Sequence, residues 1–291
     1  MEARQPDRLN GSLPIDPGAG SFGFADGQGK PLPVWYYRPP GLPENAPIVF
    51  VMHGVKRDAA YYRDNWMVTA ERFGFLLVCP EFARADYPHR TAYQLGNVID
   101  SAGEPLPKDR WSFGVIERLF DYVRVVTGNR SERYYLYGHS AGGQFVHRLA
   151  LFLPEARYAT AVAANTGWYT MPTLRGRKFP YGLRGSGTAA ETLEQAFSNH
   201  LVILLGEQDT DAADPFLRRS KGAKRQGRNR FERGLAFYAA AEREAATLGV
   251  RLNWTLETVP GAAHFDQLMM PAAAEALFRG ELARALRDKT H

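Results

Sequence analysis

The chain has 291 residues, of which 45% are hydrophobic and 23% are charged, and its formal net charge is +5. These values are those of an ordinary globular protein, long enough for one large α/β domain or two small ones. No apolar run approaches the roughly 18 residues that a membrane-spanning helix needs, and a single cysteine, Cys79, excludes an intramolecular disulfide. We therefore expect a protein without a membrane span.

The first residues of the sequence are polar and show no hydrophobic segment of a secretory signal. Cys79 lies in the apolar run 74–80, where a buried small side chain is expected rather than a reactive thiol. We expect a cytoplasmic location by default, and a secreted or periplasmic one if a signal peptide has been removed.

Predicted strands and helices alternate along the chain. Continuous apolar runs such as 48–52 are typical of strands buried on both faces of a parallel sheet, and apolar residues three and four apart indicate helices. The expected strands are 34–38, 48–52, 75–79, 134–137, 159–164, 201–205 and 251–259. The expected helices are 61–73, 113–127, 143–152, 231–248 and 266–288. This alternation predicts an α/β fold with a mostly parallel central sheet flanked by helices.

We expect one domain over residues 1–291, since no repeat or low-complexity linker divides the chain. Residues 1–33 are predicted to be an N-terminal loop segment, because 11–33 are rich in glycine and proline. Residues 165–199 form a long irregular stretch that is either a lid or pocket insertion, or a small core of its own.

The positive charge is concentrated in one part of a predicted basic loop, 211–233. Residues 218–233 contain eight basic side chains against Glu232 alone, so the rest of the chain is slightly acidic. No nucleic-acid-binding motif accompanies them, and we expect no nucleic-acid partner. The segment is then a solvated or partner-facing loop, or an anion subsite near a catalytic pocket.

Residues 138–142 read Gly-His-Ser-Ala-Gly, which fits the pattern G-x-S-x-G. An expected strand precedes this motif and an expected helix follows it, as in a nucleophile elbow, where the serine sits on a strained turn. The small neighbouring residues allow the strand and the helix to approach closely. Ser140 is therefore the candidate nucleophile.

A serine hydroxyl needs a base, and the base needs an orienting carboxylate. In the predicted fold these follow the serine in the order acid, then histidine. Asp209 comes just after the strand 201–205, with Asp211 and Asp214 as competitors, and His264 follows the last strand. We expect a catalytic triad of Ser140, Asp209 and His264. The remaining histidines are predicted to lie in turns, loops or packed positions; they are His53, His89, His139, His147, His200 and His291.

The negative charge of a tetrahedral intermediate needs two backbone N–H donors. We expect these from Ala141, directly after the nucleophile, and from Val55, with Gly54 as its rival. The substrate pocket is predicted to include His53, Gly54, Trp168 and Tyr169. No metal-binding or nucleotide-binding motif is present, so we expect no cofactor.

Four motifs together resemble the α/β-hydrolases, and more narrowly the bacterial polyhydroxybutyrate depolymerase and feruloyl esterase group. They are His53-Gly54 with 59–62, the stretch 138–143, the stretch 206–209, and the stretch 261–264. The resemblance implies an α/β-hydrolase fold and a cofactor-free serine esterase with Ser140, Asp209 and His264 as its triad. Secreted polymer depolymerases usually carry disulfides and an added polymer-binding domain, so a small-molecule or oligomeric ester is the expected substrate, of short-chain or hydroxyalkanoate type.

Two other readings stay open on the sequence alone. The same triad serves an aminopeptidase-like or acyl-transfer enzyme. A non-catalytic hydrolase-like protein could instead use the segment 218–233 to dock an anionic partner.

Overall fold

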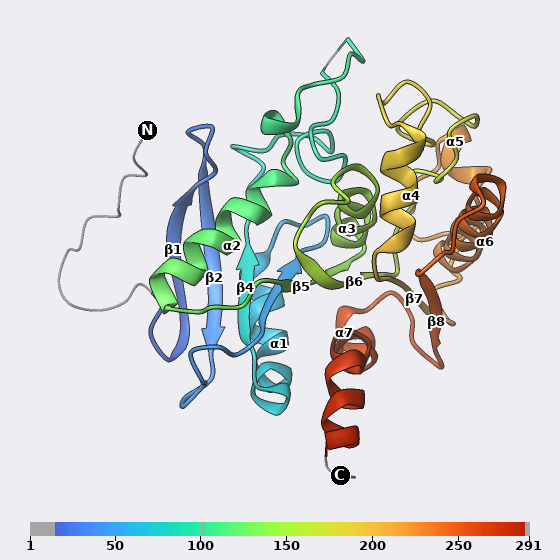
Figure 1. Cartoon of the computed structure of the whole chain (residues 1–291). Helices are drawn as coiled ribbons and strands as arrows, with labels where there is room; N and C mark the ends of the chain where they lie inside the picture. The colour runs from blue at the N-terminus through green and yellow to red at the C-terminus, as the bar shows by residue number, and fades with distance from the viewer. Residues whose placement is uncertain (1–14, 101, 289–291) are drawn as a thin grey trace.

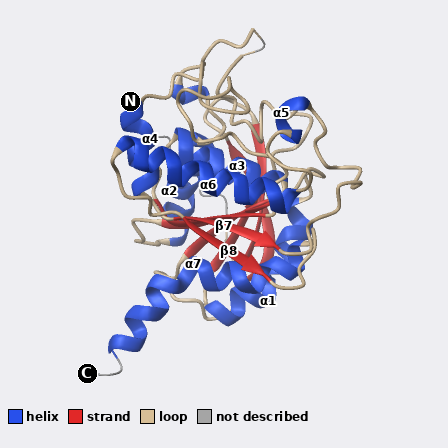
Figure 2. Cartoon of the chain, turned by 90° about the vertical axis from the view of Figure 1, so that its right-hand side faces the viewer, coloured by secondary structure: helices blue, strands red, loops and turns tan. Residues whose placement is uncertain are grey.

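The structure is a computed structural model that describes residues 15–100 and 102–288. A central sheet carries helices on both of its faces (Figure 1, Figure 2). The strands are β1 (Gly18–Ala25), β2 (Pro31–Arg38), β3 (Ile48–Met52), β4 (Leu76–Pro80), β5 (Tyr134–His139), β6 (Tyr158–Ala164), β7 (Leu201–Gly206) and β8 (Thr255–Val259). The α-helices are α1 (Ala59–Phe73), α2 (Gly114–Thr127), α3 (Ala141–Phe152), α4 (Ala190–Ser198), α5 (Lys221–Lys224), α6 (Arg230–Leu248) and α7 (Asp266–Asp288).

The eight strands lie in the order β1-β2-β4-β3-β5-β6-β7-β8. β2 runs antiparallel to both of its neighbours, and every pairing from β4 to β8 is parallel. This is the mostly parallel sheet of the α/β-hydrolase fold, as predicted. The parallel strands end at one edge of the sheet, so the loops that follow β3, β5, β7 and β8 meet there.

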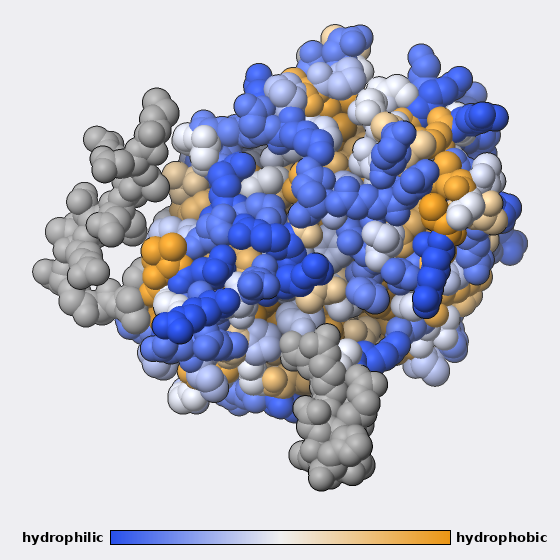
Figure 3. Space-filling model, in the orientation of Figure 1, coloured by the Kyte–Doolittle hydropathy of each residue, from blue (hydrophilic) through white to orange (hydrophobic). Residues whose placement is uncertain are grey.

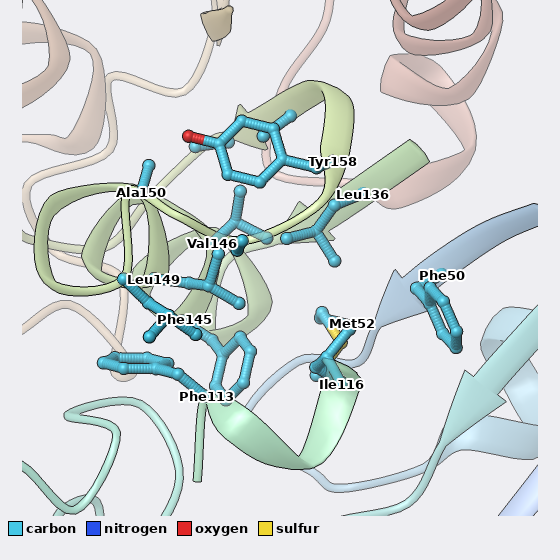
Figure 4. Close-up of a cluster of buried hydrophobic side chains, with 14 of the residues drawn as sticks. Phe50, Met52, Phe113, Ile116, Leu136, Phe145, Val146, Leu149, Ala150 and Tyr158 are labelled. Carbon is cyan, nitrogen blue, oxygen red and sulfur yellow. The ribbon is translucent and has the colours of Figure 1, made fainter. Parts of the chain in front are cut away.

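Two apolar layers hold the helices to the sheet. On one face, side chains of β3 and β5 pack against α2 and α3 (Figure 4). On the other face, α1 and α7 cover the same strands. Because β3 and β5 are buried along their whole length, both faces must be apolar, which explains the continuous hydrophobic runs in their sequences. The surface in Figure 3 is mostly hydrophilic, with smaller hydrophobic areas.

Local signals fix the ends of several helices. The Asp58 side chain accepts a hydrogen bond from the Tyr61 N–H at the start of α1, and Asn229 caps α6 in the same way through the Glu232 N–H. Gly74 and Gly249 end these two helices in the left-handed conformation, which glycine adopts without a Cβ penalty.

The N-terminal segment differs from the prediction. Of residues 1–33, only 15–33 are described, and they contain β1 and the start of β2 rather than a loop. β1 is rich in glycine and only half-buried, and its ladder with β2 forms one edge of the sheet. Its composition therefore resembles that of a loop. The pairing with β2 makes it a strand in spite of its weak intrinsic β-propensity.

The two predicted loop regions also contain helices. The stretch 165–199 is irregular only up to Ala189 and then forms α4, while 211–233 includes α5 and the first turn of α6. The strand expected over 251–259 begins at Thr255. The other expected strands and helices are confirmed to within three residues at each end. Over the described part of the chain, no helix is both long and apolar enough to cross a membrane.

Candidate active site

Ser140 occupies the sharp turn between β5 and α3. Its backbone has φ 57° and ψ −107°, a conformation that a side-chain-bearing residue rarely adopts. A Cβ on Gly142 would collide with the Met52 carbonyl oxygen, and one on Gly138 would collide with the backbone of Gly142. The two glycines therefore let the elbow pack directly against β3, and the strained turn holds the serine hydroxyl away from the sheet.

The three residues predicted as a triad lie in one hydrogen-bonded chain. The His264 Nε2 is 3.0 Å from the Ser140 Oγ, and the His264 Nδ1 is 2.7 Å from the Asp209 Oδ2. With Nδ1 protonated toward Asp209, Nε2 is left free to accept the serine proton. The nucleophile, the base and the orienting carboxylate of a serine-hydrolase triad have this arrangement.

A buried arginine stabilises Asp209, the carboxylate at one end of these hydrogen bonds. Arg230, at the start of α6, donates from Nη1 to the Asp209 Oδ1 at 3.3 Å and to the Asp214 Oδ2 at 3.0 Å. Burial raises the pKa of Asp214, but the hydrogen bond from Arg230 lowers it, and the net shift is downward. Of the two competing acids, Asp214 pairs with the arginine and Asp211 is exposed. Among the three aspartates, it is Asp209 that contacts the histidine.

Ser140 lines a cavity of about 380 Å³, together with Val55 and Ala141. Ala141 is the first residue of α3, and the first N–H groups of a helix have no partner within the helix. Val55 lies in the loop after β3, beside the elbow. The two residues predicted to supply oxyanion donors are thus placed around the serine.

His53 and Gly54 do not line this cavity, contrary to the prediction; both are buried beneath it. The His53 Nε2 accepts the Phe82 N–H at 3.0 Å, so the ring proton is on Nδ1, which points to the Gly54 carbonyl oxygen at 3.1 Å. Burial lowers the pKa of His53 to about 3. A neutral His53 therefore fixes the turn that carries Val55, and its side chain does not line the cavity.

Of the two aromatic residues expected in the pocket, Trp168 and Tyr169, the structure places only Trp168 at the cavity. Trp168 lines the cavity, stacked above the buried Arg148 guanidinium at 4.3 Å. Tyr169 is fully buried and stacks on Phe237 at 4.4 Å, so it belongs to the core and not to the pocket. Neighbouring residues on an irregular segment point to opposite sides, and the sequence offered no signal to separate them.

No protein-family model and no curated protein matches the chain. Among solved structures, it is similar to poly(aspartic acid) hydrolase-1 from Sphingomonas sp. KT-1, with 44% identity over 91% of this chain and 100% of that one and a TM-score of 0.88. It is also similar to LpqC, a poly(3-hydroxybutyrate) depolymerase from Bordetella parapertussis, with 37% identity over 92% and 94% of the two chains and a TM-score of 0.86.

The chain belongs to the serine hydrolases of the α/β-hydrolase superfamily. An S-formylglutathione hydrolase from Agrobacterium tumefaciens, at 17% identity over 92% and 98% of the two chains and a TM-score of 0.58, shares the fold. The present chain is an enzyme of the serine esterase class, as its sequence predicts.

Behind the base of this serine hydrolase lies a residue that the sequence analysis did not assign to the site. The His139 ring packs on the His264 ring with centroids 4.8 Å apart, and its Nδ1 lies 3.2 Å from the Tyr62 hydroxyl. Burial, then the charges of His264 and Arg230, lower the pKa of His139 well below its usual value. The uncharged His139 ring therefore packs against the His264 ring and restricts its rotation. Its place inside the G-x-S-x-G motif was the only available signal.

A buried carboxyl anchors the loop that carries His264. Asp266 begins α7, accepts a hydrogen bond from the Tyr137 hydroxyl at 2.6 Å and another from the Trp66 Nε1 at 3.3 Å, and is 4% exposed. Burial raises its pKa from 3.8 to about 7. Because Asp266 is two residues from His264, these contacts on β5 and α1 hold the base at the end of the sheet.

A similar anchor holds the loop after β3 in this hydrolase. The Arg57 guanidinium lies over the Tyr93 ring at 4.3 Å and donates to the carbonyl oxygens of Phe82, Tyr87 and His89. Tyr93 in turn donates to the His53 carbonyl oxygen at 2.7 Å. Tyr87 and Tyr93 are buried, and their contacts hold this loop against the segment that follows β4.

Proposed function

We propose that this serine hydrolase cleaves its substrate through an acyl-enzyme at Ser140. The Ser140 hydroxyl attacks the acyl carbon while His264 takes its proton, and Asp209 holds His264 in the required tautomer. The observation that carries this proposal is the hydrogen-bonded chain of 2.7 Å and 3.0 Å at the mouth of a cavity.

The backbone N–H groups of Val55 and Ala141 stabilise the oxyanion of the tetrahedral intermediate. His264 then protonates the leaving alcohol, and the acyl group stays on the Ser140 oxygen. A water molecule, deprotonated by His264, attacks this ester and releases the acid. The serine proton leaves on the alcohol, and the proton that His264 takes from the water passes to the Ser140 oxygen as the acid is released, so the site needs no other proton carrier.

The preferred substrate is a soluble short-chain or hydroxyalkanoate-type ester. A cavity of about 380 Å³ lies at the small end of the range for ligand pockets, and so accommodates a short acyl chain or a few units of an oligomer. The 37% identity to a poly(3-hydroxybutyrate) depolymerase supports the hydroxyalkanoate class.

Hydrolysis of an amide bond in an aspartate polymer is the second candidate. The 44% identity to poly(aspartic acid) hydrolase-1 favours it, and the same three side chains serve amide and ester hydrolysis. The two candidates differ in the leaving group, an alcohol or an amine, which His264 protonates in either case.

The proposal is tested with p-nitrophenyl acetate, butyrate and octanoate, using the wild type beside Ser140→Ala. We expect the variant to lose at least about 1,000-fold in kcat, and the wild type to prefer the two shorter chains. Equal slow rates in both proteins would contradict the mechanism. A folded Ser140→Ala protein, checked by circular dichroism, is the control. Poly(aspartic acid), assayed in parallel for released amines, tests the second candidate.

A further inference from the structure

Five arginines line the cavity beside Ser140, and no aspartate or glutamate of the described chain lines it with them. They come from the loop after β3, the segment after β4, and the region between β7 and α6. These arginines are Arg57, Arg84, Arg90, Arg218 and Arg230. A cavity with one sign of charge on all sides attracts ligands of the opposite charge.

Three of the five arginines have partners that explain their presence. Arg230 is paired with two carboxylates, as described above. Arg57 donates to three backbone carbonyl groups and stacks on a tyrosine ring. Arg84 donates to the Val55 carbonyl oxygen at 2.7 Å, which steadies the loop that presents the Val55 N–H. These three side chains thus have structural roles whether or not a ligand binds.

Arg90 and Arg218 have no carboxylate partner in the described part of the chain, although the Tyr181 hydroxyl forms a hydrogen bond with Arg218. Neither forms an ion pair within the described part of the chain, and the buried Nε of Arg218 has no acceptor there. Burial and the neighbouring Arg218 charge lower the pKa of Arg90. Two like charges held together without a counter-ion cost stability, and an anion bound between them would remove that cost.

The segment that carries Arg218 is held in place by buried contacts. Arg233 is 1% exposed and donates to the carbonyl oxygens of Arg218 at 2.8 Å, Gly167 at 2.7 Å and Gly227 at 3.1 Å. These bonds tie the basic segment to the loop that carries Trp168. The backbone at Arg218 is therefore fixed before any ligand arrives, which reduces the entropy lost on binding.

We propose that Arg90 and Arg218 form a carboxylate-binding subsite next to Ser140, so that the preferred substrate is an ester that carries a carboxylate on its acyl or alcohol part. The proposal rests on the proposed function and deepens it. A guanidinium group binds a carboxylate through two parallel hydrogen bonds, and the cavity holds this subsite and the serine in one space of about 380 Å³. The carboxylate thus orients the ester toward Ser140.

The experiment compares matched pairs of anionic and neutral esters. Monomethyl glutarate against dimethyl glutarate places the carboxylate on the acyl part, with methanol release followed by NMR. The anion of 3-acetoxybutyrate against its methyl ester places it on the alcohol part, with acetate release followed in the same way. We expect the wild type to show a kcat/KM at least about tenfold higher for the anionic member of one pair. The pair that shows it identifies the part that carries the carboxylate.

Arg90→Gln and Arg218→Gln should each reduce that preference at least about tenfold. Lys224→Gln removes the same charge from an exposed position on α5 that does not line the cavity, and should leave the preference as it is. A wild type that prefers the neutral esters in both pairs, or a preference equal in the wild type and the two arginine variants, would overturn the proposal.

Calorimetric titration with glutarate separates this subsite from the proposed chemistry, because it needs no turnover. We expect glutarate to bind the wild type and Ser140→Ala, and to bind Arg218→Gln at least about tenfold more weakly. Equal binding by Arg218→Gln, or no binding by the wild type, would overturn the subsite. Loss of ester hydrolysis together with intact glutarate binding would instead contradict the proposed function alone.

Discussion

Replacing the buried Asp266 by asparagine should change the pH dependence of stability. Asparagine keeps an oxygen that can accept the Tyr137 hydroxyl and removes the titrating group. Burial raises the folded-state pKa of Asp266 from 3.8 to about 7. Below about pH 4 the carboxyl is protonated in the folded and unfolded states alike. As the pH rises from about 4 to about 7, the unfolded chain has released a proton that the folded chain keeps, so the free energy of unfolding falls.

The size of the effect follows from the same values. One pH unit within this window corresponds to about 1.4 kcal/mol, so the wild type should lose about 3 kcal/mol between pH 5 and pH 8 through this residue. Asp266→Asn lacks that loss. The free energy of unfolding of Asp266→Asn minus that of the wild type should therefore be about 3 kcal/mol larger at pH 8 than at pH 5.

Urea titrations of both proteins at pH 5 and pH 8, followed by tryptophan fluorescence, measure this difference. Asp211→Asn, at an exposed position, is the control and should shift the two curves equally at both pH values. A stability difference between Asp266→Asn and the wild type that stays constant from pH 5 to pH 8 would contradict the raised pKa, because it would mean that Asp266 titrates alike in the folded and unfolded states.

Three further predictions concern the site. Gly142→Ala should destabilise the protein by about 3 kcal/mol or more, measured by urea titration, because the new methyl group collides with the Met52 carbonyl group; an unchanged midpoint would contradict the close packing. Arg230→Gln should cost about 3 kcal/mol, since it removes the cation paired with the buried Asp209 carboxylate, whereas Arg228→Gln, at an exposed pair, should leave the stability almost unchanged. His139→Ala should lower kcat about 10- to 100-fold at a similar KM, because His264 loses its supporting ring; an equal rise in KM would point to a binding role instead.

The order of elements could be predicted from the sequence because strands such as β3 and β5 are buried on both faces and read as continuous apolar runs. The approximate place of Ser140, Asp209 and His264 was also predictable, since each follows a strand at the same edge of the sheet. β1 was not predictable, because its glycine-rich sequence pairs only at an edge.

Side-chain direction limited the rest of the site prediction. Trp168 and Tyr169 are adjacent in an irregular segment, and only the packing of Tyr169 on Phe237 shows which of them leaves the pocket. The arginines were visible as a charge cluster, but Arg233 is buried away from the cavity, Arg230 lines it while paired with two carboxylates, and Arg218 lines it without a carboxylate partner. Local sequence could not separate these roles, because contacts with distant loops decide them.

The most direct test of the central claim is to label the protein with a fluorophosphonate probe and locate the adduct by peptide mass spectrometry. We expect a single adduct on Ser140, slow labelling of His264→Ala, and no labelling of Ser140→Ala. Undiminished labelling of a folded Ser140→Ala protein, or an unlabelled wild type, would contradict the claim that Ser140 is the nucleophile of this hydrolase.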